Sequence, residues 1–149
     1  MKGPLIAAGL LTAIMFACGG AQKPDHAIDK RNEITALWTQ IRDWRRAAHM
    51  DLDSSPVTQN AIRFKNVKDA ERVCVANHKV TKECSDVCDL SDAICDNAEA
   101  ICSIADELGK DDDFAQGKCT DAKASCREAK QKCCGCSPAA PAASNEGTF

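Results

Sequence analysis

Two rows of cysteine residues constrain the fold of this chain more than any other feature. Within each row the cysteines recur every seven residues, which is two turns of an α-helix, so each row lies along one helix face. When the chain is folded back between Lys110 and Asp111, the two rows face each other in register. The spacing therefore predicts an antiparallel helical hairpin. Its three predicted disulfides are Cys102–Cys119, Cys95–Cys126 and Cys88–Cys133.

The residues around the fold point and between the cysteines support the same hairpin. Gly109 is a helix stop, and the aspartates at 111–113 suit the cap of a following helix. The seam positions between the cysteines are small, which a disulfide ladder needs because bridged Cα atoms lie roughly 4.4–6.8 Å apart. These small residues are Ser91, Ala98, Ala105, Ala122 and Ala129.

The charges of the two arms also favour antiparallel pairing. Residues 83–113 hold eleven acidic residues and one base, whereas residues 118–132 hold five bases and two acids. Exposed ion pairs contribute little each, so this charge pattern supports the pairing without being its main cause.

Composition indicates a small domain that disulfides stabilise. Aromatic residues make up 4% of the 149 residues and charged residues 28%, so the hydrophobic core must be thin. Eleven cysteines in such a chain predict disulfides and hence an oxidising compartment. A net charge of −3 argues against nucleic acid as a partner.

The start of the chain predicts export and lipidation. Residues 1–17 read as a signal peptide with an apolar run of twelve, Leu5–Phe16, which is too short to span a bilayer. Met15-Phe16-Ala17-Cys18 resembles a lipobox, although leucine is usual at position 15 and a small residue at position 16. Cleavage there would leave Cys18 to carry acyl chains such as palmitate, and would leave ten other cysteines to pair completely. Ordinary cleavage after Ala21 is the alternative.

We expect the mature chain to divide into three parts: a flexible tether at 18–26, a cysteine-rich helical domain at 27–136 and a disordered tail at 137–149. The absence of aspartate after Cys18 resembles lipoproteins sorted to the outer membrane. The anchored domain would then face the periplasm or the cell surface.

Two further helices are predicted before the hairpin. The first, 27–50, has a stripe of apolar residues with two tryptophans, expected to pack on the hairpin, with a partner-binding patch as the alternative. Its arginines Arg42, Arg45 and Arg46 are expected to be solvated, and to lie near the acidic arm. The second, 56–80, starts after Ser55-Pro56. A kink or short break within 81–85 is expected to separate it from the hairpin, with continuation of the helix through 81–85 as the alternative. Its expected apolar side is Val57, Ala61, Phe64, Val67, Cys74 and Val75.

Four cysteines remain to be paired. Cys84 extends the ladder, and Cys136 is its nearest candidate partner. Cys134 lies about 100° around the helix from Cys133, so it faces another helix, where Cys74 is available. The predicted pairs are Cys84–Cys136 and Cys74–Cys134, and the exchanged pairs Cys74–Cys136 and Cys84–Cys134 remain open.

The cysteine-rich third of the chain resembles a known group of sequences. Cys84-x3-Cys88, the run from Ile94 to Gly109, the segment from Cys119 to Ala129, and Cys133-Cys134-Gly135-Cys136 carry the likeness. Together they resemble a recurrent segment of uncharacterised cysteine-rich lipoproteins of Gram-negative bacteria of the myxobacterial kind. The resemblance implies a helical architecture and a place in the cell envelope, and it implies no activity.

Other cysteine chemistries are weaker. Cys84-x3-Cys88 is typical of Cu(I)-storage helical bundles, but the other spacings are seven and the seams lack histidine and methionine. Cys134-Gly135-Cys136 could exchange disulfides, although a lone Cys-x-Cys is a weak signal. The three histidines do not fall at zinc-ligand spacing.

The sequence thus predicts an all-α fold, a small helical bundle built on a disulfide-stapled antiparallel hairpin. The function we expect is that of a non-enzymatic, lipid-anchored envelope protein with a structural or interaction role. Its partners would be the membrane, through Cys18, and an unidentified envelope protein, and no cofactor is expected. Periplasmic Cu(I) binding or storage is the alternative.

Overall fold

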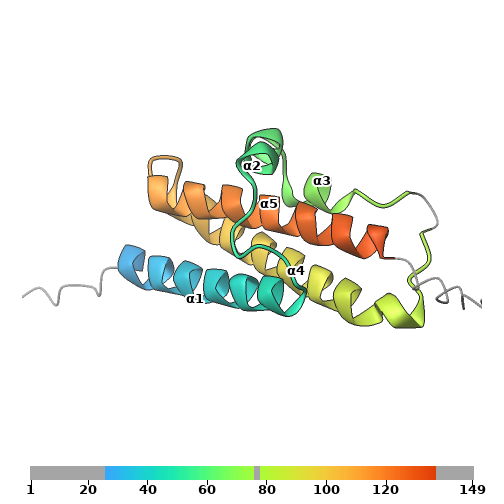
Figure 1. The fold of residues 1–149 in the computed structure, drawn as a ribbon. Coiled ribbons are helices and arrows are strands. Elements are labelled where there is room, and N and C mark those ends of the chain that lie inside the picture. The colour runs from blue at the N-terminus through green and yellow to red at the C-terminus, as the bar shows by residue number, and fades with distance from the viewer. Residues whose placement is uncertain (1–25, 76–77, 137–149) are drawn as a thin grey trace, which may run out of the picture.

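The structure is a computed structural model that describes residues 26–75 and 78–136 (Figure 1). Its described residues form helices and connecting turns without a β-strand. The helices are α1 (His26–Ala47), α2 (Pro56–Ile62), α3 (Val67–Glu71), the 3₁₀-helix η1 (Lys82–Cys84), α4 (Ser85–Leu108) and α5 (Asp113–Gly135). This architecture confirms the prediction of a small, disulfide-stapled helical bundle. No helix in the described ranges combines the length and apolar character needed to cross a membrane.

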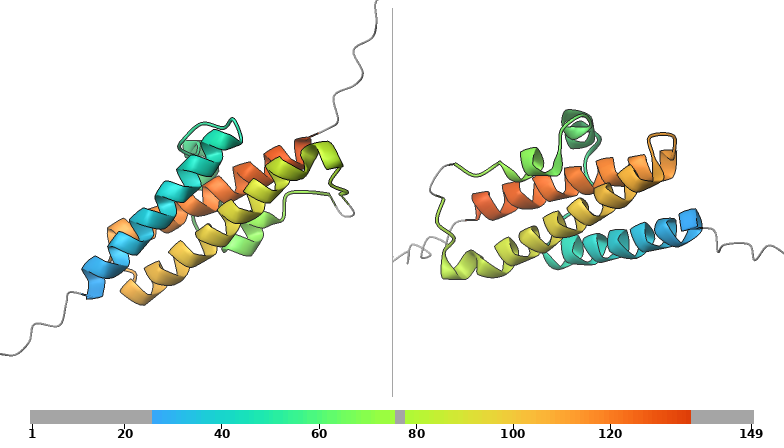
Figure 2. Two further views of the ribbon diagram at one scale, coloured as in Figure 1. Left: turned by 90° about the horizontal axis from the view of Figure 1, so that it is seen from below. Right: turned by 180° about the vertical axis from the view of Figure 1, so that it is seen from behind.

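The hairpin of α4 and α5 forms the centre of the fold. The two long helices run antiparallel, α1 covers one side, and α2 and α3 lie on the opposite side (Figures 1 and 2). Helix α1 packs on both hairpin helices, α2 packs on α5, and α3 packs on α5 and α4. Every other helix thus packs on the element that the cysteine spacing predicts.

The hairpin turn forms where the sequence places it. Gly109 ends α4 with φ of 97°, a left-handed value that glycine adopts without strain. Asp112 caps α5, because its Oδ1 accepts a hydrogen bond from the Ala115 backbone N–H at 3.1 Å. The side-chain amide of Gln116 donates to the carbonyls of Ala105 and Gly109, at 2.9 and 3.1 Å, and so ties the two helices together beside the turn.

The core surrounds the hairpin seam, between α1 on one side and α2 and α3 on the other. The small seam residues Ser91, Ala98, Ala105, Ala122 and Ala129 are all buried, which lets α4 and α5 approach closely. Ile34 and Ile41 of α1 pack against the hairpin with Trp38, and Trp44 packs at the edge of the same cluster. The tryptophans therefore cover the hairpin, as predicted.

Helix α1 ends at Ala47, three residues before the predicted end. His49 adopts φ of 53°, its backbone N–H donates to the Arg46 carbonyl, and the Met50 N–H donates to the Arg45 carbonyl at 2.9 Å. This is the hydrogen-bond pattern of a Schellman cap, with histidine in the position that glycine usually takes.

The prediction of one helix over 56–80 is wrong. Helix α2 stops at Ile62, and α3 starts after Asn66, whose side-chain oxygen accepts a hydrogen bond from the Asp69 N–H at 2.8 Å. Lys123 of α5 stabilises the break, since its ammonium binds the carbonyls of Arg63 and Lys65. Helix α3 ends at Glu71, so the break before the hairpin begins well ahead of 81–85, where the short η1 leads directly into α4.

The predicted apolar side of this segment is also largely wrong. Val57, Ala61, Phe64 and Val75 are exposed, and Phe64 has 94% of its surface accessible. Val67 is buried as predicted, together with Ile62 and Ala70. The helical period assigned to a continuous helix does not persist through the turn at 63–66, so the residues on either side present different faces to the hairpin.

Candidate functional site

Five disulfides join all ten cysteines in the part of the chain that the structure describes. The inner ladder has Cα–Cα distances of 4.6 Å for Cys102–Cys119, 4.6 Å for Cys95–Cys126 and 4.8 Å for Cys88–Cys133. The outer bridges are Cys84–Cys136, at 5.9 Å, and Cys74–Cys134, at 5.3 Å. The three inner pairs are those that the register of the two rows predicts. The outer pairs are the ones predicted for the remaining four cysteines, and the exchanged outer pairs do not occur.

The bridges differ in their access to solvent. Cys95 and Cys126 have 1% and 0% of their surface exposed, and Cys88 and Cys133 are also buried. Both residues of Cys102–Cys119, near the hairpin turn, are half-buried, as are both residues of Cys74–Cys134. The middle of the ladder is therefore closed to solvent, and its turn end is open.

The Cys134-Gly135-Cys136 motif serves two different bridges. Cys134 is joined to Cys74 after α3, and Cys136 is joined to Cys84 at the start of α4. The end of α5 is thus fastened to two separate segments. The two sulfurs of the motif are not bonded to each other, so the motif is not a self-contained dithiol pair.

Among the described residues, one group has the compactness of a metal site. The Cys95 and Cys126 sulfurs and a Glu71 carboxylate oxygen lie within 4.8 Å of one another. The two sulfurs are joined as a disulfide, whereas soft metals such as Cu(I) bind thiolates. This group can therefore offer thiolate ligands only when that disulfide is reduced.

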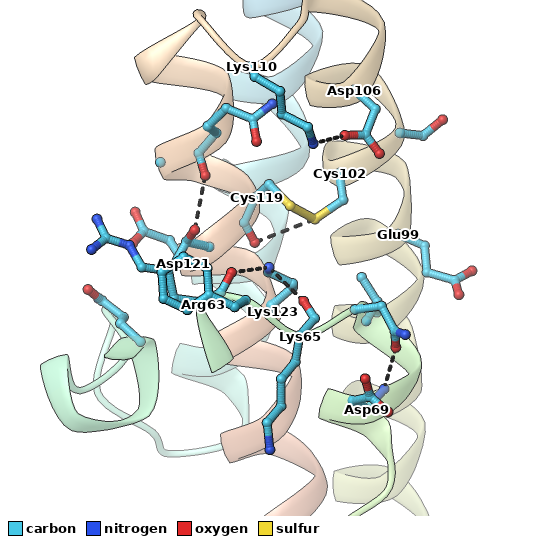
Figure 3. Close-up of a pocket in the computed structure, with 18 of the residues that line it drawn as sticks. Arg63, Lys65, Asp69, Glu99, Cys102, Asp106, Lys110, Cys119, Asp121 and Lys123 are labelled. Carbon is cyan, nitrogen blue, oxygen red and sulfur yellow. Dashed lines mark hydrogen bonds and ion pairs between the residues drawn. A yellow bond between two sulfur atoms is a disulfide. The ribbon is translucent and has the colours of Figure 1, made fainter. Parts of the chain in front are cut away.

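An open groove of about 1500 Å³ lies beside the turn end of the ladder. It is bounded by α4, the first half of α5 and the α2–α3 connection, and the Cys102–Cys119 disulfide forms part of its wall (Figure 3). Charged side chains of both signs surround it. The labelled ones in Figure 3 are Arg63, Lys65, Asp69, Glu99, Asp106, Lys110, Asp121 and Lys123.

Lys123 is the most buried charged group of the groove. Only 7% of its surface is exposed, and its Nζ donates to the carbonyls of Arg63 and Lys65 at 2.9 and 2.8 Å. Burial lowers the pKa of the Lys123 ammonium, the neighbouring charge of Lys110 lowers it further, and Asp106 opposes the shift. No carboxylate of the described residues lies within ion-pair distance of Lys123, so the two carbonyls and the groove solvate its charge.

A buried ion pair lies on the other side of α5, and it corrects one prediction. Arg45, expected to be solvated, is 1% exposed, and its Nη2 lies 2.8 Å from Oε2 of Glu128. The Arg45 guanidinium also donates to the carbonyls of Asp51, at 2.6 Å, and Asp53, at 3.0 Å. Arg45 therefore fastens the α1–α2 connection to α5.

The environment of Glu128 favours its charged form. Burial by itself would raise the pKa of the Glu128 carboxyl. Hydrogen bonds from Arg45, from the Ser55 backbone N–H at 2.8 Å and from Thr58 outweigh burial, so the pKa lies below its ordinary value. The spacing of α1 held a signal for the burial of Arg45, because this residue lies four residues after Ile41 and seven after Trp38, on the buried stripe.

Arg42 and Arg46, the other two arginines of that prediction, form no ion pair with residues 83–113 in the described part of the chain. Arg31, a fourth arginine of α1, does pair with this acidic arm, through Asp112. Arg42 lies 3.6 Å from Asp53, and the exposed Arg46 pairs with Asp43 of its own helix. Among the described residues, one ion pair joins α4 directly to α5, between Lys130 and Asp92. The remaining acids of α4 that form pairs outside the hairpin do so with α1, through Lys30–Glu107, and with α3, through Lys68–Glu99.

Several predictions fall on residues that the structure does not describe. These are the signal peptide at 1–17, the lipidation of Cys18, nearly all of the tether at 18–26, and the tail at 137–149. Within the described part, His26 already belongs to α1, so the helical domain begins one residue before its predicted boundary.

A scan against protein-family models and searches of curated proteins and solved structures found no match to this chain. The resemblance to myxobacterial lipoproteins therefore stays a prediction.

Proposed function

We propose that the protein is a non-enzymatic, lipid-anchored protein of the cell envelope with a structural or interaction role. The observation that carries this proposal is the pairing of all ten described cysteines in five disulfides. Disulfides persist in oxidising compartments such as the periplasm or the cell surface. Cys18 is the cysteine that this pairing leaves over, which supports its assignment to lipid.

The pairing also supports a role without cysteine chemistry in the ladder core. The buried rungs Cys95–Cys126 and Cys88–Cys133 offer neither free thiols nor access. The hairpin would instead serve as a rigid body that displays its surfaces at the end of a membrane tether. Val57 and Phe64, 79% and 94% exposed, are large apolar side chains on the α2 side, and they suit contact with an envelope protein.

Cu(I) storage is the second candidate, favoured by the convergence of Glu71 with Cys95 and Cys126. In the reduced protein the two rows would become a column of thiols, which are the ligands that Cu(I) prefers. This function requires the thiols to remain reduced in the cell.

The mass of the protein taken from the cell envelope separates the two candidates. A protein with five disulfides gains about 10 Da on reduction, because each disulfide takes up two hydrogens. That gain, with no thiols titrated before reduction, is the result we expect. An unchanged mass with ten titratable thiols and bound copper would overturn the proposal in favour of storage.

The anchor needs its own experiment. The full-length protein expressed in a Gram-negative host should partition into the detergent phase and incorporate labelled palmitate, and the Cys18→Ser variant should do neither. A matched Cys74→Ser variant should retain both properties. Equal labelling of the wild type and the Cys18→Ser variant would contradict lipidation at Cys18.

A further inference from the structure

The Cys102–Cys119 disulfide differs from the other two disulfides of the inner ladder, here called the inner rungs, because it borders the open groove. Its residues are half-buried, whereas those of Cys95–Cys126 and Cys88–Cys133 are buried. Figure 3 shows its sulfur–sulfur bond between α4 and α5, beside the groove residues Lys110 and Lys123. Because a thiolate must reach a disulfide sulfur directly to exchange with it, this rung is the reactive end of the ladder.

Five cations and five acids line the groove, and more of the cations than of the acids lack an ion-pair partner among the described residues. Two of its lysines are matched by carboxylates: Lys68 pairs with Glu99, and Lys110 pairs with Asp106. Arg63, Lys65 and Lys123 have no carboxylate within ion-pair distance in the described part of the chain, although they line the same groove. Among the acids that line the groove, Asp113 is the one without an ion-pair partner in the described part of the chain. Positive charge beside an accessible disulfide attracts an anionic thiol.

From the solvent access of this disulfide and the unpaired cations of the groove, we infer that the groove receives a small thiol bearing carboxylate groups. This thiol exchanges with the Cys102–Cys119 disulfide. Glutathione represents this chemical class. The inference goes beyond the structural role proposed above, because it assigns a covalent modification site to one rung of the scaffold.

The surroundings of the two sulfurs set the direction of exchange. Cys119 lies in the first half of α5, with Lys123 one turn further along the same face. Cys102 lies near the carboxyl end of α4, with Glu99 and Asp106 one turn away on either side. Neighbouring cations stabilise a thiolate, whereas neighbouring carboxylates oppose it. Cys119 is therefore the better leaving group.

The exchange balances without a metal or a cofactor. The incoming thiolate forms a bond to the Cys102 sulfur, the Cys102–Cys119 bond breaks, and its electron pair leaves on the Cys119 sulfur. A second thiol molecule can then attack the mixed disulfide, which releases the oxidised thiol dimer and leaves Cys102 as a thiolate. Reduction of the Cys102–Cys119 disulfide by two electrons thus consumes two thiol molecules.

The remaining contacts keep the hairpin closed after this rung opens. Four other disulfides are untouched, and Gln116 still binds the carbonyls of Ala105 and Gly109. Arg31 of α1 also holds the turn, with its Nη2 2.9 Å from the Asp112 carboxylate. The modified protein therefore keeps its fold and carries the thiol in the groove.

Limited exchange on the oxidised, full-length protein tests the inference. The protein is treated separately with glutathione and with cysteamine, a thiol without a carboxylate, then trapped with a maleimide and mapped by peptide mass spectrometry. We expect glutathione on Cys102 and maleimide on Cys119, before any label on the inner rungs. The half-buried Cys74–Cys134 bridge is the internal control. The preference for glutathione over cysteamine should be about twofold to fivefold greater at Cys102–Cys119 than at that bridge. Equal preference at both bridges, or inner rungs that open as early, would overturn the inference.

Charge variants test the role of the groove. Lys65→Gln should slow glutathione exchange at Cys102–Cys119 by about twofold or more. It should not slow cysteamine exchange, because cysteamine carries an ammonium and no carboxylate. Lys82→Gln, an exposed lysine of η1 outside the groove, should change neither. Neutralising Glu99 and Asp106 together, as Glu99→Gln and Asp106→Asn, should move part of the bound glutathione from Cys102 to Cys119. Unchanged rates in Lys65→Gln, or unchanged positions of glutathione in the double variant, would contradict the proposed site.

Discussion

At the scale of single residues, two buried cations, Arg45 and Lys123, hold the connecting segments against α5. Arg45 and Glu128 join the α1–α2 connection to α5, and Lys123 joins the α2–α3 connection to the same helix. A buried charge is stable only when its partners are in place. These side chains therefore fix the paths of two segments that have few buried apolar residues of their own.

Breaking the buried ion pair should destabilise the protein in a pH-dependent way. Glu128→Gln leaves the Arg45 charge unpaired in a nearly solvent-free position, so we expect a loss of about 3 kcal/mol in the free energy of unfolding at pH 7. Because the pKa of Glu128 is lowered in the fold, its stabilisation is present above the carboxyl's unfolded pKa and is lost as the pH falls through the folded value. Urea unfolding of the wild type should thus show that the free energy of unfolding falls at acidic pH, and this fall should be smaller in the Glu128→Gln variant. Parallel pH profiles for the two proteins would contradict this account.

Lys123 should stabilise the break between α2 and α3. Lys123→Met leaves the Arg63 and Lys65 carbonyls without their donor, and we expect a loss of about 1–3 kcal/mol together with faster amide hydrogen exchange over 62–70. Lys118→Met is the matched control on α5, since the Lys118 ammonium lies over the Trp38 ring and does not touch this segment. If amide exchange in the Lys123→Met variant became faster only in α1, Lys123 would not be the residue that stabilises the break between α2 and α3.

At the scale of secondary-structure elements, the hairpin was predictable and the segment before it was not. Cysteine spacing, seam residues and the Gly109 turn each depend on a local period or a local conformation, which the sequence displays directly. The end of α2 depends instead on Lys123, about sixty residues away, and on the Asn66 cap. The valines and Phe64 of this segment resemble an amphipathic helix in isolation, so the sequence pattern alone favoured the wrong element.

The small residues of the seam set the distance between α4 and α5. Ala98 is fully buried between the Cys95 and Cys102 rungs, whose Cα–Cα distances are 4.6 Å. Ala98→Leu should destabilise the oxidised protein by about 1–3 kcal/mol, because the added atoms force the helices apart. It should also raise the number of free thiols after oxidative refolding, measured by thiol titration. Ala61→Leu, at an exposed position of α2, is the control and should change neither quantity.

At the scale of the whole molecule, the disulfides compensate for a thin core. The described core consists largely of isoleucines, alanines and cysteines around Trp38, and the aromatic content of the chain is 4%. Cross-links stabilise the fold mainly by restricting the unfolded chain, and a loop the size of that between Cys102 and Cys119 is worth roughly 3 kcal/mol in the chain-entropy model. Nested bridges add less each, because the chain is already constrained. The three inner cysteine pairs were predictable because they share one register, whereas the outer pairs Cys84–Cys136 and Cys74–Cys134 lie outside it and the sequence left their exchange open. Arg45 pairs with a residue that no local pattern identifies.

The five bridges should therefore fall into two groups when they are removed. Cys74→Ser with Cys134→Ser releases only the segment around α3 from the end of α5, so α1 and the hairpin should keep their helical circular dichroism and a cooperative thermal transition. Full reduction removes the ladder as well, and without it the thin core should leave the chain largely unfolded at 37 °C. A fully reduced protein that melts at the temperature of the oxidised one would show that burial alone stabilises the bundle. In that case the thiols would be available for metal, and the case for Cu(I) storage would strengthen at the expense of the scaffold.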